Sequence, residues 1–284
     1  MTNTQEKSDS YIFVSVVMPN YNNAMYIAEA IESVLAQTYT HFECIILDDA
    51  STDESLDVIK RQATRDARIR VLQNDTNQGI PKTRNCLFRE VSPKARYIAI
   101  IDSDDVMELN RLEEQVTFLE ENKSYAGVGS HTTLIDEKGN VVGTHRYPTD
   151  NREIKKTLLH MNPFAQSAMM LRAGAVRKTG WYDETLTRAQ DYDYWIRMIQ
   201  SYDMGNIDTP LTRFRIHASQ GRSIGAKKSL WHSFRVRSRY LFTQEFFSFK
   251  GLIIWCGYAI LLVSPLVCVS WVTSFVRKVT GRAS

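Results

Sequence analysis

Four short apolar runs alternate with helical segments over the first hundred residues, and this alternation limits the possible folds more than any other feature of the chain. In chain order, the apolar runs are 14–18, 44–47, 69–72 and 97–101, and the helical segments between them are 24–37, 53–66 and 81–89. In the first helical segment, apolar residues recur three and four positions apart, as on one face of a helix. The pattern predicts an α/β fold with a mostly parallel central sheet and helices on both faces.

The pattern changes after residue 105, but no boundary between two domains is visible. A charged amphipathic helix is predicted over 109–122, followed by an irregular stretch over 124–150 with a turn at 137–140. Beyond it we expect helices over 151–160 and 190–201, a strand over 165–171 and an extended segment over 210–217. We therefore predict a polar, disordered tail over 1–11 and one globular domain over 12–220.

Positive charge is concentrated in the last quarter of the chain. After residue 212 there are twelve Lys and Arg residues and one acid, Glu245, so this part carries a charge of +11. The rest has 23 basic and 31 acidic residues, a charge of −8, which brings the whole chain to +3. Such a basic segment favours an anionic partner, either nucleic acid or lipid headgroups.

An uncharged, mainly apolar stretch over 251–276 decides between these two partners. Its 26 residues exceed the roughly 20 that cross a bilayer as a helix, and a nucleic-acid interface would not need it. We predict a basic, helical connector over 221–250, a membrane-spanning or membrane-embedded helix over 251–276 and a basic tail over 277–284. More basic residues precede the stretch than follow it, which places the large domain at the cytoplasmic face of the inner or plasma membrane. The alternative is a buried or in-plane helix broken at Pro265.

Five carboxylates directly follow two of the predicted strands. Asp48 and Asp49 follow the second strand, and Asp102, Asp104 and Asp105 follow the fourth. In open parallel sheets, ligands bind beyond the carboxyl ends of the strands, where these side chains would repel one another unless a cation compensated them. Hard oxygen ligands suit Mg²⁺ or Mn²⁺. The alternative is a solubilising turn that caps the next helix.

Five sequence stretches together resemble the family 2 glycosyltransferases of the GT-A fold. They are VSVVMPNYN (14–22), LDDASTDES (47–55), NQGIPKTRN (77–85), IAIIDSDD (98–105) and RAQDYDYWIRM (188–198). Each is weak alone, but all five occur in the family order, and the resemblance covers about 12–220. It implies an inverting transfer of a sugar from a nucleotide-sugar, with a UDP-sugar as the expected donor. The expected acceptor is a lipid-linked glycan of a bacterial surface polysaccharide, by analogy of fold.

The resemblance also assigns residues to the nucleotide. Pro19 and Tyr21 would wall the base, and Asp49 would accept hydrogen bonds from the base or the ribose. Arg84 would meet the diphosphate or the ribose. Lys82 could do the same, although a solvated helix face accounts for it equally well, and Asp48 is a candidate for bracing the loop.

Three further residues are assigned to the metal by the same resemblance. Asp104 is the predicted direct ligand, and Asp102 would face the ribose or a metal-bound water. His217 would bind the metal or the pyrophosphate, unless its role is structural. Asp105 would either share the metal or cap the next helix. The metal would stabilise charge on the departing nucleoside diphosphate.

Asp191 is the predicted catalytic base, which would take the proton from the acceptor hydroxyl. The family often has Glu at the preceding position, where this chain has Gln190. The alternative is that Asp191 only caps its helix. Trp181 and Tyr182 fall where the family builds its acceptor side, and they either stack on a sugar ring or pack.

Other classes of enzyme fit the sequence less well. The first strand is followed by Pro19-Asn20-Tyr21-Asn22 and not by the G-x-G-x-x-G turn of an NAD-dependent epimerase, and no phosphate-binding P-loop occurs. The Gly-rich loop with Arg and Lys expected of a nucleotidyltransferase is also missing. A non-catalytic or a processive membrane-associated relative remains the alternative, although processive synthases usually have several spans and a Gln-x-x-Arg-Trp motif.

Overall fold

Nine strands form one sheet in the computed structural model, which describes residues 12–217, 226–243 and 249–263. The strands are β1 (Val14–Asn20), β2 (Phe42–Asp48), β3 (Ile69–Gln73), β4 (Tyr97–Ile100), β5 (Val106–Met107), β6 (Tyr125–Ile135), β7 (Val141–His145), β8 (Met170–Arg172) and β9 (Asp203–Arg215). Their order is β3-β2-β1-β4-β8-β6-β9-β5, with β7 paired to β6.

The sheet is parallel in its first half and mixed in its second. Strands β1 to β4 pair in parallel, as the alternating pattern predicted. Beyond β4, the pairs β4–β8, β6–β8, β6–β7 and β5–β9 are antiparallel, and β6–β9 is parallel. The prediction of a mostly parallel sheet therefore holds for β1 to β4, while the sheet as a whole is mixed.

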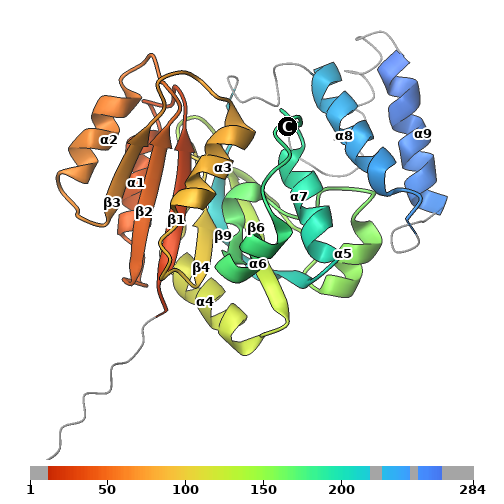
Figure 1. Ribbon diagram of the computed structural model, residues 1–284, viewed down its shortest axis with the longest axis horizontal. Helices are drawn as coiled ribbons and strands as arrows, with labels where there is room; N and C mark the ends of the chain where they lie inside the picture. The colour runs from red at the N-terminus through yellow and green to blue at the C-terminus, as the bar shows by residue number, and fades with distance from the viewer. Residues whose placement is uncertain (1–11, 218–225, 244–248, 264–284) are drawn as a thin grey trace, which may run out of the picture.

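Helices cover both faces of the sheet (Figure 1). They are α1 (Ile27–Leu35), α2 (Ser55–Ala63), α3 (Ile80–Glu90), α4 (Arg111–Glu121), α5 (Asn151–Thr157), α6 (Ala173–Thr179), α7 (Gln190–Ile199), α8 (Ala226–Tyr240) and α9 (Phe249–Val263). Because side chains alternate along a strand, Val16 and Met18 pack with α1, α2 and α4, whereas Val17 packs with α3 and α7 on the opposite face. The side chains on both faces are buried, as a doubly covered sheet requires.

The prediction of an irregular stretch over 124–150 was wrong, because β6 and β7 form a hairpin there. Strand β6 was hidden by its small residues, which interrupt the apolar pattern. Two of these small residues, Gly127 and Gly129, leave no room for a side chain. A Cβ on Gly127 would lie 2.6 Å from Leu171 Cδ2, and a Cβ on Gly129 would lie 2.2 Å from Asn206 Oδ1. The predicted turn at 137–140 joins the two strands.

Helices α8 and α9 pack side by side, at the end of the molecule opposite α2 and β3 (Figure 1). Helix α8 falls within the connector that we predicted over 221–250. Within the described residues, no helix is both long and apolar enough to cross a bilayer. The predicted span 251–276 is described only as far as Val263, and the predicted tails 1–11 and 277–284 lie outside the described residues.

Candidate active site

A cleft of about 470 Å³ lies at the carboxyl ends of β1 and β4. The strand order reverses here, since β2 lies on one side of β1 and β4 on the other, and such a switch point is where open α/β sheets bind ligands. Eight of the residues that the sequence predicted for the site line this cleft. They are Pro19, Tyr21, Asp49, Arg84, Asp102, Asp104, Asp191 and His217. The fold thus gathers residues from separate stretches around one space.

The loops around the cleft have an unusual backbone. Among the described residues, three that are not glycine have positive φ: Asn22 (52°), Ala50 (59°) and Ala189 (56°). Asn22 directly follows Tyr21, Ala50 directly follows Asp49, and Ala189 lies two positions before Asp191. A left-handed conformation costs roughly 1–2 kcal/mol for an L-residue, and such strain concentrates where a site must be held in one shape.

Two acids at the end of β2 brace neighbouring loops. Asp48 is fully buried and accepts hydrogen bonds from Asn20 Nδ2 (2.7 Å), Ser51 N (3.0 Å) and Ser51 Oγ (2.6 Å). The interpretation of Asp48 as a structural residue is therefore confirmed.

Asp49 has a role that the sequence did not reveal. Its carboxylate accepts from Asn74 Nδ2 (2.7 Å), from the Gln78 amide (2.8 Å) and from the Gly79 amide (2.9 Å). Since an ionised carboxylate has about four acceptor positions, Asp49 holds the 74–79 loop and retains capacity for one further donor in the cleft. Gly79 has φ +80°, which a residue with a side chain adopts only with strain.

Arg84 forms a buried ion pair with Asp102, the first of the three acids that follow β4. Its Nη2 lies 2.6 Å from Asp102 Oδ1, and its side chain is only 7% exposed. Burial lowers the pKa of Arg84, but the nearby Asp102, Tyr182 and Asp191 raise it by more, so its guanidinium stays charged. Lys82 is exposed and does not line the cleft, in agreement with a solvated helix face.

Asp104 contacts His217, which lies 113 residues later in the sequence. The distance from His217 Nε2 to Asp104 Oδ2 is 2.9 Å, and the imidazole also packs against Tyr26, with ring centroids 5.1 Å apart. Over the ranges that the structure describes, no three His, Cys, Asp or Glu side chains converge as metal ligands. A carboxylate and an imidazole at the edge of a cleft still fit a cation whose other ligands are waters and substrate phosphates.

Asp105 neither lines the cleft nor caps a helix. Its Oδ1 accepts from the Arg215 amide at 2.9 Å, which ties the end of β4 to β9. Burial raises the pKa of Asp105 well above its ordinary value, and the charges of Asp104 and Asp102 add to this shift.

Asp191 stands in the first turn of α7 and lines the cleft. The N-cap of this helix is Ala189, without a side-chain capping bond, so the alternative in which Asp191 serves only as the cap is wrong. Asp191 Oδ2 accepts from Asn162 Nδ2 at 2.8 Å. No pattern in the sequence singles out Asn162, because it lies in a loop with no motif.

The two aromatic residues predicted for the acceptor side do not line the cleft. Tyr182 is buried, its ring packs at a tilt against those of Tyr194 and Phe88, and its hydroxyl accepts from Gln166 Nε2 at 2.7 Å. The guanidinium of Arg89 lies over the ring of Trp181, with its Cζ 5.4 Å from the ring centroid. The packing interpretation therefore fits Tyr182, whereas Trp181 is 38% exposed outside the cleft.

The sequence profile described as Glycosyl transferase family 2 matches residues 15–180, more than half of the chain. This chain belongs to glycosyltransferase family 2. EpsE of Bacillus subtilis is 36% identical over 207 residues, which cover 71% of this chain and 72% of that protein. An uncharacterized glycosyltransferase of Methanocaldococcus jannaschii is 35% identical over 207 residues, which cover 72% of this chain and 70% of that one.

Solved structures share the fold of this family 2 glycosyltransferase at low sequence identity. The S. aureus TarS structure in complex with UDP-GlcNAc has a TM-score of 0.67 and 20% identity, and covers 82% of this chain and 68% of its own. The structure of the mannosyltransferase PcManGT of Pyrobaculum calidifontis, in complex with GDP-Man and Mn²⁺, has a TM-score of 0.65 and 14% identity. The match covers 95% of this chain and 76% of PcManGT. The GT-A type fold and glycosyl transfer are therefore the properties that this chain shares with its family.

Proposed function

We propose that this glycosyltransferase moves a hexose from a UDP-sugar to an acceptor hydroxyl with inversion, using Asp191 as the base and one Mn²⁺ or Mg²⁺ ion. The observation that carries the proposal is that Asp49, Asp102, Asp104 and Asp191 line one cleft, although they come from three different parts of the fold. An acceptor hydroxyl needs a base on one side of the sugar, and the nucleotide needs its binding groups on the other. A single base facing a single leaving group gives one displacement, and hence inversion.

Each residue of the cleft has a task in this proposal. Tyr21 is 46% exposed at the end of β1 and offers a ring face to the base. Asp49 takes a donor group of the base or the ribose, and Arg84 with Asp102 orients the ribose and the diphosphate. Asp104 and His217 would hold the cation, which supplies positive charge for the departing diphosphate. Asp191, held by Asn162, accepts the proton of the acceptor hydroxyl.

The proposed donor is tested by measuring thermal stability in a panel of UDP-, GDP- and dTDP-sugars with and without Mn²⁺. A ligand at 100 times its Kd stabilises the folded state by about 2.7 kcal/mol, which in a chain of this size raises the Tm by about 5 °C. We expect this shift for a UDP-sugar with Mn²⁺ and little shift when EDTA replaces the metal. A Tm that no nucleotide-sugar raises would contradict the donor assignment, and an equal shift in EDTA would contradict the metal.

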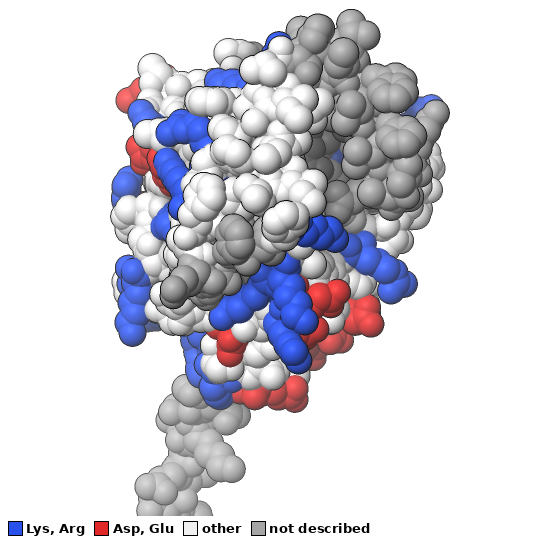
Figure 2. Space-filling model, turned by 90° about the vertical axis from the view of Figure 1, so that its right-hand side faces the viewer, with Lys and Arg blue, Asp and Glu red and all other residues white. Residues whose placement is uncertain are grey.

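The proposed acceptor is a lipid-linked glycan at the cytoplasmic face of the inner or plasma membrane. Support comes from the charge of +11 after residue 212 and from the outer face of α9. There Ile253, Ile260 and Val263 are exposed by 60%, 63% and 85%. In Figure 2, a broad surface without charged side chains lies above a band of Lys and Arg side chains. Such a combination favours insertion among anionic headgroups.

Membrane binding is tested by sedimenting the full chain with vesicles of phosphatidylglycerol or phosphatidylcholine. We expect the double substitution Ile253→Asp and Ile260→Asp to weaken binding to phosphatidylglycerol vesicles at least about tenfold, a change of 1.4 kcal/mol. Val141→Asp is the matched control, since Val141 is equally exposed (66%) but lies on β7. Protein that stays in the supernatant with both lipids, or equal binding by the double variant and the control, would contradict the membrane assignment.

A further inference from the structure

Asp191 is held by two segments of the chain, and its geometry depends on both. It belongs to the first turn of α7, and its Oδ2 accepts from Asn162 in the loop after α5 (2.8 Å). The next residue, Tyr192, joins the same two segments, because its hydroxyl donates to the Leu158 carbonyl at 2.5 Å. Movement of either segment would therefore shift the carboxylate relative to the cleft.

Helix α8 binds the segment after α5 through Arg237. The guanidinium is almost fully buried (4% exposed), and its Nε donates to the Leu159 carbonyl at 3.0 Å. It also lies over the ring of Tyr192, 4.9 Å from the centroid. Arg237 thus contacts Leu159, three residues before Asn162, and Tyr192, the residue directly after Asp191.

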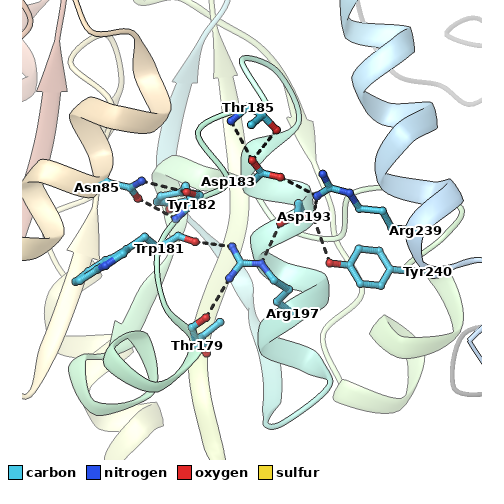
Figure 3. A network of polar contacts seen from close by, with 10 residues as sticks. All are labelled: Asn85, Thr179, Trp181, Tyr182, Asp183, Thr185, Asp193, Arg197, Arg239 and Tyr240. Carbon is cyan, nitrogen blue, oxygen red and sulfur yellow. Dashed lines mark hydrogen bonds and ion pairs between the residues drawn. The ribbon is translucent and has the colours of Figure 1, made fainter.

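The same helix binds the first turn of α7 through Arg239 and Tyr240 (Figure 3). Arg239 Nη1 lies 3.0 Å from Asp193 Oδ1, and the Tyr240 hydroxyl donates to the same oxygen at 3.2 Å. Asp193 is only 1% exposed and also pairs with Arg197 Nε at 3.0 Å. Burial and the charge of Asp193 raise the pKa of Tyr240 to about 12, so its hydroxyl remains a donor. A buried carboxylate with cationic partners fixes the start of α7 firmly.

Helix α8 also restrains the loop that leads into α7. Arg239 Nη1 lies 2.8 Å from Asp183 Oδ2, and this carboxylate in turn accepts from the Thr185 amide through its Oδ1 at 2.9 Å. His232 Nε2 lies 3.2 Å from Thr187 Oγ1, and Thr187 lines the cleft. The loop ends at Ala189, whose left-handed backbone needs support from its surroundings.

We infer that α8 is a positioning element for the base, in which Arg239, Arg237 and Tyr240 fix both segments that hold Asp191. None of the three lines the cleft, so they act through Asp191 and the 183–189 loop. This inference rests on the proposed function, because it assumes that Asp191 is the base. It adds that α8 helps to position the base and is not only a connector to the predicted membrane segment.

The test compares three variants of the full chain with the wild type by steady-state kinetics with saturating acceptor. Arg239→Ala should lower kcat by about 10- to 100-fold, since a displacement of the order of 1 Å costs that much, and should leave KM for the donor unchanged. Arg239→Lys, which keeps the charge beside Asp193 and Asp183, should restore most of the lost kcat. Arg235→Ala is the control, because Arg235 stands on the same helix and forms no ion pair with a described residue; its kcat should equal that of the wild type.

The outcomes separate this inference from the proposed function. If Asp191→Asn is inactive but Arg239→Ala has wild-type kcat, the positioning role is wrong while the base assignment stands. If Asp191→Asn keeps full activity, the proposed function itself fails. Should Arg239→Ala be poorly folded by circular dichroism, Tyr240→Phe decides, because it removes only one hydroxyl. A lower kcat with unchanged KM supports the positioning role, whereas wild-type kcat, or a rise in KM alone, overturns it.

Discussion

Substitution of Asp191 by Asn is expected to reduce the rate of sugar transfer by about 10³-fold, which is the usual contribution of a general base. An amide has the shape of the carboxylate and keeps an oxygen for the hydrogen bond from Asn162, so the cleft should keep its form. It cannot take the proton of the acceptor hydroxyl. The loss should therefore appear in kcat, while donor binding, measured by thermal shift with UDP-sugar and Mn²⁺, stays at the wild-type level.

A matched control for Asp191→Asn is Asp57→Asn. Asp57 is also a carboxylate in the first turn of a helix, but it is exposed on α2, outside the cleft. Loss of charge at a helix N-terminus alone changes stability by only about 0.3–1 kcal/mol, so this variant should keep its activity. Wild-type turnover by Asp191→Asn would rule out Asp191 as the base. An equal loss of activity in both variants would mean that the loss comes from a less stable helix and not from removal of the base.

The regular first half of the fold was predictable because its strands are buried on both faces. Strands β1, β2 and β4 consist mainly of buried apolar residues. Strands β1 and β2 end in the polar residues Asn20 and Asp48, and Asp102 follows two residues after the end of β4. This is why the positions of Asp49, Asp102 and Asp104 around one cleft could be foreseen. The topology alone brings the strand ends together, so no side-chain contact has to be known to predict that these residues lie close to one another.

The second half was less predictable because tertiary packing overrides the local pattern there. Gly127 and Gly129 weaken the strand signal of β6, yet β8 and β9 approach too closely for larger residues. The strand predicted over 165–171 is divided into a 3₁₀ turn, Gln166–Ala168, and the short β8. Local propensity describes neither constraint.

The hydrogen bonds and ion pairs that support the site residues could not be predicted from the sequence. Asp49 clamps the backbone of Gln78 and Gly79, and Asn162 meets Asp191 across a gap of 29 residues. Arg239 reaches Asp193 from 46 residues later. Polar residues in loops and on helix surfaces are normally solvated, so nothing in their spacing distinguishes these contacts from an ordinary exposed face.

Removal of the Asp104 carboxylate is the change with the next largest expected effect. Asp104→Ala should lower transfer by about 10³-fold, because charge stabilisation by a metal is worth several kcal/mol. Unlike Asp191→Asn, it should also abolish the Mn²⁺-dependent part of donor binding, measured by calorimetry with UDP. His217→Ala should shift the Mn²⁺ dependence in the same direction but less, since it leaves the carboxylate in place.

The control for Asp104→Ala is Asp75→Ala, because Asp75 is exposed in the loop beside the cleft and does not line it. It removes the same negative charge from the same end of the molecule, so a general electrostatic effect on the nucleotide would appear in both variants. An effect confined to Asp104→Ala and His217→Ala assigns the cation to this carboxylate–imidazole pair. Wild-type Mn²⁺ dependence in Asp104→Ala would instead mean that the nucleotide binds through Arg84 and the loop amides, without a metal at this position.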